Sequence, residues 1–172
     1  SAAAAAAVPP GPSSLFVKTT TKPSAAAAAA VPRGIVIVVR PNDDEAERAL
    51  ARLEGFGHLS ATVTQNVDGL QQRAGSRNVI ELHGSLADVE CLSCGARSEP
   101  GPHMESFAKT RKPPTCPCGG LLKPATISFG QSPKEDDLSR AFNAARGADL
   151  VLALGSSLTV HPAASIPLLA VE

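Results

Sequence analysis

GIVIVVRPNDDEAERALARLEGFGHLSATVT, residues 34–64, predicts a strand, a helix and a second strand. After Gly34 the chain runs through β-branched residues to position 39, a pattern typical of a strand buried on both faces of a parallel sheet. Pro41-Asn42-Asp43-Asp44 then offers a helix cap and acids for the first turn. Apolar residues recur at helical spacing until two glycines, and Leu59–Thr64 returns to a strand pattern. This order predicts an α/β fold.

The same alternation returns towards the end of the chain. Leu138–Arg146 has an apolar helical face, and Asp149–Leu154 again resembles a buried strand. Gly155-Ser156-Ser157 follows that strand directly, as Gln65-Asn66 follows Leu59–Thr64. Open α/β sheets bind ligands beyond the carboxyl ends of their parallel strands, so these two positions indicate a nucleotide site.

The stretch TQNVDGLQQRAGSRNVIELH, residues 64–83, is dense in polar groups for a segment beside predicted strands. It contains an amide, a carboxylate and an imidazole, and we expect the functional centre within this stretch. Each residue also has a simpler explanation. Asn66 and Asp68 could cap a turn before Gly69, and a single histidine before glycine is often only a turn residue.

Two cysteine pairs, Cys91-x2-Cys94 and Cys116-x-Cys118, are separated by 21 residues. Four thiolates bind zinc tetrahedrally and leave no position for water, so we predict one structural Zn²⁺. The second pair is one residue shorter than usual, and a redox pair or unrelated cysteines are the alternatives. The intervening residues show little hydrophobic periodicity. We therefore predict a small zinc module at 91–122, inserted into the α/β domain and dependent on its metal.

The amino-acid composition limits the classes of binding partner that we expect. Lys plus Arg number 16, as do Asp plus Glu, and the aromatic residues are five Phe without Trp or Tyr. Neither charge nor stacking groups favour direct nucleic-acid binding. No apolar run reaches the roughly 18 residues of a membrane helix, so we expect no membrane partner. Paired cysteines suited to a metal favour a reducing intracellular compartment, such as the nucleus, cytoplasm or mitochondrion.

The first 33 residues differ from the rest. SAAAAAAVP occurs at Ser1–Pro9 and again, letter for letter, at Ser24–Pro32. Such short alanine runs, flanked by proline, do not hold a helix without packing. We expect 1–33 to be a disordered low-complexity tail, with a degenerate targeting peptide as the alternative. The absence of an initiator Met suggests a fragment or a processed product.

Five motifs in one order resemble the sirtuins, which are NAD-dependent protein-lysine deacylases. They lie between about Asn42 and Pro167, and they are TQNVDGL, ELHGS, the paired-cysteine module, KPATISFGQ and GSSLTVHPAASIP. The resemblance implies a Rossmann-like NAD-binding domain at 34–90 and 123–172. It also implies removal of acyl groups from lysine, with release of nicotinamide and transfer of the acyl group to ADP-ribose.

The resemblance also implies roles for single residues. His83 would be the general base that helps to deprotonate a ribose hydroxyl. Asn66 and Asp68 would hold the ribose, an ordered water and the nicotinamide carboxamide. The further NAD contacts would be Gln65, Gly155, Ser156 and Ser157.

The acyl-lysine peptide, a histone segment among the candidates, would pair as an added strand with one segment of backbone. Its residues are Ile127, Ser128, Phe129, Gly130 and Gln131. Gln131 stands where the family usually has an acid, which changes the charge beside the peptide. The zinc would hold structure and take no part in the chemistry.

Two family features are missing from this sequence. The family's Gly-Ala-Gly phosphate turn should follow the first strand, but Arg40-Pro41-Asn42 stands there, and proline lacks a backbone donor. The chain also stops at Glu172, before the family's last strands. We therefore expect an incomplete sheet with an open edge on its C-terminal side, and weak or no NAD binding. The alternatives to a deacylase are a catalytically inactive zinc-containing peptide-binding domain and an NAD-dependent ADP-ribosyltransferase.

Overall fold

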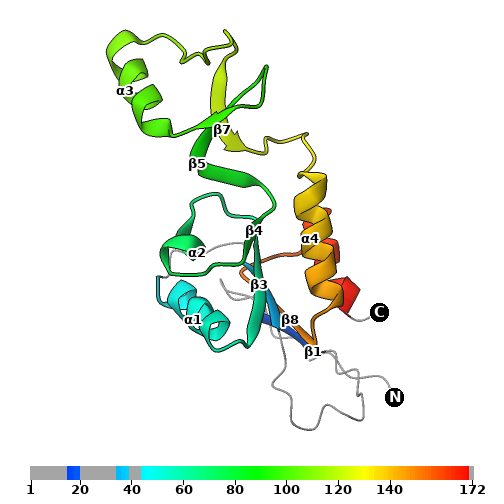
Figure 1. The fold of residues 1–172 in the computed structure, drawn as a ribbon. Coiled ribbons are helices and arrows are strands. Elements are labelled where there is room, and N and C mark those ends of the chain that lie inside the picture. Colours follow the sequence, from blue (N-terminus) through cyan, green and yellow to red (C-terminus); the bar gives the residue numbers. More distant parts are fainter. Residues whose placement is uncertain (1–14, 20–33, 39–43, 171–172) are drawn as a thin grey trace.

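The computed structural model describes residues 15–19, 34–38 and 44–170, drawn in colour in Figure 1. Several sequence predictions fall outside these residues. They are the alanine-rich repeats, the helix cap before Asp44 and the Arg40-Pro41-Asn42 turn.

The larger of two sheets has five strands in the order β1-β8-β2-β3-β4. Their bounds are β1 (Leu15–Thr19), β2 (Gly34–Val38), β3 (Leu59–Thr64), β4 (Val79–Glu81) and β8 (Leu150–Leu154). β2 pairs in parallel with both β3 and β8, and β3 pairs in parallel with β4. The predicted α/β fold with a parallel, Rossmann-like sheet is confirmed.

Helices cover both faces of this sheet (Figure 1). On one side lie α1 (Asp44–Gly55) and the single turn α2 (Leu70–Arg73), and on the other lie α4 (Glu135–Arg146) and the 3-10 helix η2 (Ala163–Ala170). α4 includes the predicted helix and begins three residues earlier. Its predicted apolar face is confirmed, because Ala141 and Ala145 are fully buried against the sheet residues of the core.

A second sheet lies at one end of the molecule, at the top of Figure 1. Its order is β6-β5-β7, from β5 (Gly84–Cys91), β6 (Arg97–Ser98) and β7 (Leu122–Thr126). It extends from 84 to 126, beyond the predicted 91–122, because β5 and β7 pair along a stalk that leads back to the larger sheet. Helix α3 (Pro100–Thr110) was not predicted, and none of its residues is buried.

β1 corrects two sequence predictions. Leu15–Thr19 lies inside the segment expected to be a disordered tail, yet it pairs antiparallel with β8 along its whole length. The expectation of disorder is therefore wrong for these five residues. The edge of β8 expected to stay open is also covered. The physical reason is that Leu, Phe, Val and Thr favour strands, and an unpaired sheet edge accepts a strand.

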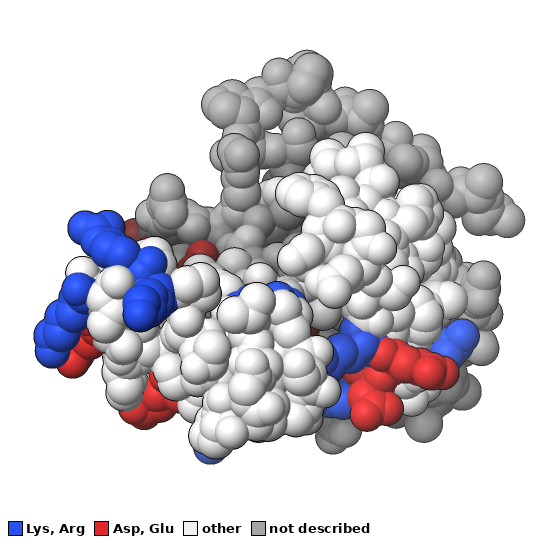
Figure 2. Space-filling view, turned by 90° about the horizontal axis from the view of Figure 1, so that it is seen from above, with Lys and Arg blue, Asp and Glu red and all other residues white. Residues whose placement is uncertain are grey.

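The face seen from above, in Figure 2, has small groups of basic and acidic residues around a broad uncharged area. Charges of one sign do not spread across this face. Among the described helices, none has the length and apolarity needed to cross a bilayer.

Candidate functional site

Three parallel strands end together at one edge of the large sheet. Val38, the last residue of β2, pairs with Thr64 on one side and Leu154 on the other. Neighbouring strands lie about 4.8 Å apart, so the ends of β3 and β8 are roughly 10 Å from each other. Gln65-Asn66 and Gly155 therefore leave the sheet at the same edge, where α/β proteins bind ligands.

The loop after β3 is held by its own side chains. The Asn66 N–H donates to the buried Thr64 hydroxyl over 3.1 Å. Asp68 accepts the Leu70 N–H at 3.0 Å with Oδ1, and Gly69 between them has a φ of 68°, which favours glycine. Asp68 thus closes a turn over Gly69 just before α2, as the simpler explanation allowed, and this bond uses one of its two carboxylate oxygens.

His83 is brought to this loop by the pairing of β4 with β3. Its ring Nδ1 lies 3.1 Å from the Gln65 carbonyl oxygen. A carbonyl oxygen can only accept, so Nδ1 carries the proton in this contact, and the neutral form of the ring has its lone pair on Nε2. The half-buried imidazole is therefore oriented to take a proton at Nε2.

The first residue of the predicted peptide-binding segment, Ile127, is hydrogen-bonded to His83. The Ile127 N–H donates to the His83 carbonyl oxygen over 2.7 Å. Beyond it, the backbone of Gln131 donates to the Ser128 carbonyl, and the Gln131 side-chain oxygen accepts the Ser128 N–H at 2.9 Å. The Phe129 side chain, inside this closed turn, is fully exposed. Gln131 thus supplies the turn with a neutral acceptor.

The turn after β8 has a backbone conformation that would let a ligand come close to its main chain. Gly155 has a φ of 62°, and Leu158 also adopts a positive φ, of 53°, which is uncommon for a residue with a side chain. The buried Ser156 hydroxyl accepts the Leu158 N–H at 3.0 Å, while the Ser157 hydroxyl is exposed and lies 2.9 Å from the Thr159 hydroxyl. Ser156 therefore shapes the turn, and Ser157 faces outwards with Thr159, a partner that the sequence analysis missed.

The described part of this edge fits a dinucleotide. Amides, a carboxylate, hydroxyls and a glycine with positive φ are the donors, acceptors and close approach that ribose, phosphate and a carboxamide require. Gln65, Asn66, Asp68 and Ser157 are among the residues that contribute these groups.

The four cysteines are positioned to bind a zinc ion. All four sulfurs lie within 4.8 Å of one another, with Cys91 and Cys118 at 3.5 Å and Cys94 and Cys116 at 3.7 Å. Tetrahedral ligands at the Zn–S bond length are about 3.8 Å apart, so the donor set fits the metal. The shorter second pair closes its turn through the Gly119 N–H, which donates to the Cys116 carbonyl.

Local backbone geometry prepares Cys91 for a metal. The N–H groups of Cys94 and Ser93 stabilise its thiolate and lower the pKa of the thiol to about 6. A side chain at Gly120 would collide with this sulfur, because a Cβ there would lie 2.6 Å from it. Glycine at 120 is therefore required by the sulfur cluster.

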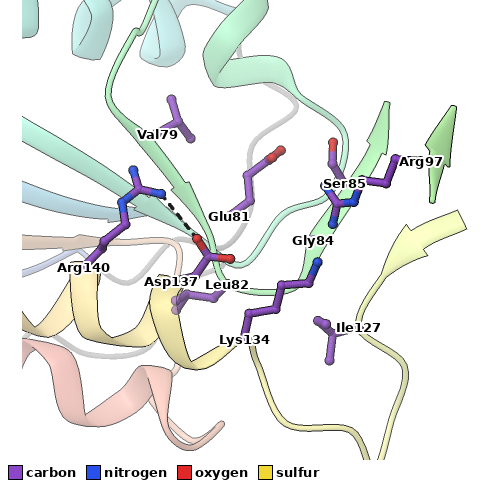
Figure 3. A pocket seen from close by; sticks show the side chains of 10 residues that line it. All are labelled: Val79, Glu81, Leu82, Gly84, Ser85, Arg97, Ile127, Lys134, Asp137 and Arg140. Carbon is purple, nitrogen blue, oxygen red and sulfur yellow. Dashed lines mark hydrogen bonds and ion pairs between the residues drawn. The ribbon is translucent and has the colours of Figure 1, made fainter. Parts of the chain in front are cut away.

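A charged pocket of about 160 Å³ lies between the five-stranded sheet and the three-stranded sheet (Figure 3). Asp137 faces Arg140 at 3.3 Å, and Lys134 reaches towards the Ser85 and Arg97 side. Burial raises the pKa of Glu81 in its wall, although hydrogen bonds from Gln72 and Ser85 oppose the shift. No role for the charged residues of this pocket follows from the sequence, in which their signal is a carboxylate inside the apolar run Val79–Leu82.

Comparisons with known proteins agree with this geometry. The sequence model of the Sir2 family matches residues 28–162. The NAD-dependent protein deacetylase of Sulfurisphaera tokodaii is 47% identical over 125 residues, which cover 73% of this chain and 49% of that protein. The chain spans about half the length of the curated relatives it matches.

Solved structures give the same result. A Sir2 complex with a p53 peptide and NAD⁺ has a TM-score of 0.69 at 38% identity and covers 73% of this chain and 52% of that chain. Sir2Tm bound to a propionylated peptide has a TM-score of 0.73 at 28% identity, and the match covers 80% of this chain and 76% of that chain. With a family match over 28–162 and this shared fold, the chain belongs to the Sir2 family, the sirtuins.

Proposed function

We propose that this chain carries the catalytic segment of an NAD-dependent protein-lysine deacylase. One observation carries the proposal: His83 connects the cofactor edge with the peptide segment. Its ring contacts the Gln65 carbonyl at 3.1 Å, and its own carbonyl accepts the Ile127 N–H at 2.7 Å. The imidazole is thus held where an acyl-lysine beside Ile127–Gln131 would meet a nucleotide bound at the strand ends.

NAD, when bound, supplies the ribose carbon that accepts the acyl oxygen as nicotinamide leaves. In the proposed reaction His83 accepts a ribose hydroxyl proton at Nε2, while Nδ1 stays fixed on the Gln65 carbonyl. Asn66 and Asp68 orient the ribose and the carboxamide, because their loop is fixed through Thr64 and Leu70. Ile127–Gln131 presents backbone groups to the peptide, and acetylated, propionylated and similar lysines are the proposed substrates.

Nicotinamide release tests the enzyme. The chain is incubated with NAD and an acetyl-lysine peptide, and release is compared with that of His83→Tyr. We expect turnover that His83→Tyr reduces by at least 100-fold, within the range for loss of a general base. The control is His58→Tyr, which changes a histidine outside the site. Equal loss in both variants, or full activity in His83→Tyr, would contradict the role of His83.

A second candidate is a peptide-binding domain without turnover. It is favoured by one observation: the Ser128–Gln131 turn is closed by its own two hydrogen bonds and so does not depend on a bound nucleotide. Calorimetry with acetyl-lysine peptide, with and without NAD, separates the candidates. Peptide binding without any heat of NAD binding or nicotinamide release would favour this second function.

We also propose a reducing intracellular compartment, since a four-thiolate zinc site requires reduced cysteines. Microscopy of the native protein checks this. Its recovery from an oxidising secretory compartment would contradict the proposal.

A further inference from the structure

The charged pocket between the two sheets is separate from the cofactor edge. Its walls come from β4, from the stalk strands β5 and β6, and from the beginning of α4 (Figure 3). Of the functional residues predicted from the sequence, all of which the structure describes, only Ile127 lines this pocket. A ligand bound here would therefore lie outside the proposed catalytic centre and would connect α4 with the stalk.

The size of the pocket suits a small organic molecule. A single buried water needs a cavity of about 10–15 Å³, and an engineered cavity of about 150 Å³ binds benzene. The pocket has a volume of about 160 Å³. It can therefore hold a ligand of about six non-hydrogen atoms.

The acidic groups of the pocket lack one positive partner. Asp137 is paired with Arg140 at 3.3 Å, but none of the ion pairs among the described residues includes Glu81. Glu81 Oε1 is shielded from solvent and has no hydrogen-bond partner in the described part of the chain. Burial is the main cause of the raised pKa of Glu81, and the charge of Asp137 adds to it. A positive group in the pocket would thus be stabilised beside Glu81.

The basic groups meet on the stalk side of the pocket. Lys134 and Arg97 both contact Glu90, at 3.4 and 3.1 Å. An ammonium has three donors and a guanidinium has five, so both side chains keep donors for a further acceptor. The Ser85 hydroxyl accepts the Ala87 N–H at 3.2 Å and can still donate its own proton. A ligand carboxylate would find its donors here.

We propose that this pocket binds a small zwitterion, of the size of a simple amino acid, with its ammonium beside Glu81 and its carboxylate beside Lys134 and Arg97. A bare metal ion would be repelled by the two cations, and a simple anion by the carboxylate of Glu81. An apolar ligand would leave that carboxylate buried without a partner. A zwitterion satisfies both sides at once. The inference does not depend on the proposed deacylase reaction, because the pocket shares no proposed catalytic residue with it.

Titration of the full chain tests the proposal. L-alanine and β-alanine are the zwitterionic probes, and the backbone amide shifts are followed by NMR. We expect saturable shifts at residues 79–85 and 134–140, with a dissociation constant of about 1 mM or tighter. Propionate and ethylammonium each keep only one of the two charges of alanine. Each should bind at least about 10-fold more weakly than the zwitterions, because one side of the pocket stays without its partner.

Two variants test the two sides of the pocket. Glu81→Gln keeps the shape of the side chain but not its charge, and it should weaken zwitterion binding at least about 10-fold. Lys134→Ala removes a donor to the carboxylate and should also weaken binding. Glu105→Gln and Lys109→Ala, on exposed α3, are the matched controls and should bind as the full chain does. The proposal is overturned if neither zwitterion gives saturable shifts below about 20 mM. It is also overturned if a singly charged probe binds as tightly, or if either pocket variant binds like the controls.

Discussion

The two sheets of this protein are stabilised in different ways. In the five-stranded sheet, strand residues such as Ala61 and Val63 are fully buried between helices on both faces. Beside the three-stranded sheet, helix α3 has no buried residue, and Leu92 and Met104 are largely exposed. The larger sheet is thus held by buried apolar surface, whereas the smaller depends on its β5–β7 pairing and on the sulfur cluster. The two should therefore respond differently to the same perturbation.

Removal of the metal should have the largest effect, and only on the smaller sheet. Structural zinc contributes about 10–16 kcal/mol of apparent binding energy in small zinc-finger peptides. With a chelator, or with Cys91→Ser, we expect amides in 84–126 to lose protection from hydrogen exchange while those of β3 keep theirs. The measurement is exchange followed by mass spectrometry. Uniform loss over both sheets would show that the two units unfold together.

Truncation of an apolar side chain should have the opposite pattern, with a larger effect in the five-stranded sheet than in the smaller sheet. Leu59, at the start of β3, is only 5% exposed, and Leu59→Ala should cost about 2–5 kcal/mol of unfolding free energy. Leu121 beside the cysteines is 51% exposed, and Leu121→Ala should change stability by about 0.5 kcal/mol or less. Urea unfolding measures both. Similar costs at the two positions would mean that Leu121 is buried in solution.

Between the two sheets, Glu81 should lower stability at neutral pH. Burial raises its pKa above the usual 4.5, so the folded state binds this proton more tightly than the unfolded chain does. Stability therefore falls as pH rises from 4.5 through the raised pKa. Glu81→Gln should increase the free energy of unfolding at pH 7 by at most about 1 kcal/mol, because the side chain is only partly buried. The melting temperature should therefore rise at pH 7 and stay unchanged at pH 4. Glu105→Gln on exposed α3 is the control, and a loss of stability at pH 7 in Glu81→Gln would contradict this sign.

The smallest expected effect comes from the ion pair that fastens the stalk to α4. Glu90 lies 3.4 Å from Lys134 and 3.1 Å from Arg97. Burial opposes ionisation of Glu90, but these two cations outweigh it and lower its pKa. The pair should thus stabilise above pH 4.5, and the contribution is lost as pH falls through the lowered pKa.

Lys134→Ala should cost about 0.2–1 kcal/mol at pH 7 and low salt, and less in high salt. Thermal unfolding at two salt concentrations measures this cost. Lys109→Ala on α3 is the matched control. An effect of Lys134→Ala that is independent of salt would indicate lost packing in place of lost charge.

Sequence reasoning succeeded where the local pattern has one physical meaning. The β-branched run from Gly34 and the apolar run from Leu150 are strands of the parallel sheet, as continuous apolar runs of this length predict. Cys91 and its three partners meet because only a compact cluster satisfies one tetrahedral ion. It failed for α3 and β1, whose sequences have weak patterns. α3 begins at a proline in the first turn and packs little, and β1 is a strand only because β8 offers it an edge.

By itself, the sequence determined which groups this protein has: strands, thiol pairs, and the amide, carboxylate and imidazole of residues 64–83. Only the tertiary structure decided how they meet. The pairing of β4 with β3 sets the His83 ring on the Gln65 carbonyl, and the return of β7 sets Ile127 on His83. It also decided that Leu15–Thr19 belongs to the sheet. The reason is that these contacts join residues far apart in the chain, and local propensity contains no information about such pairs.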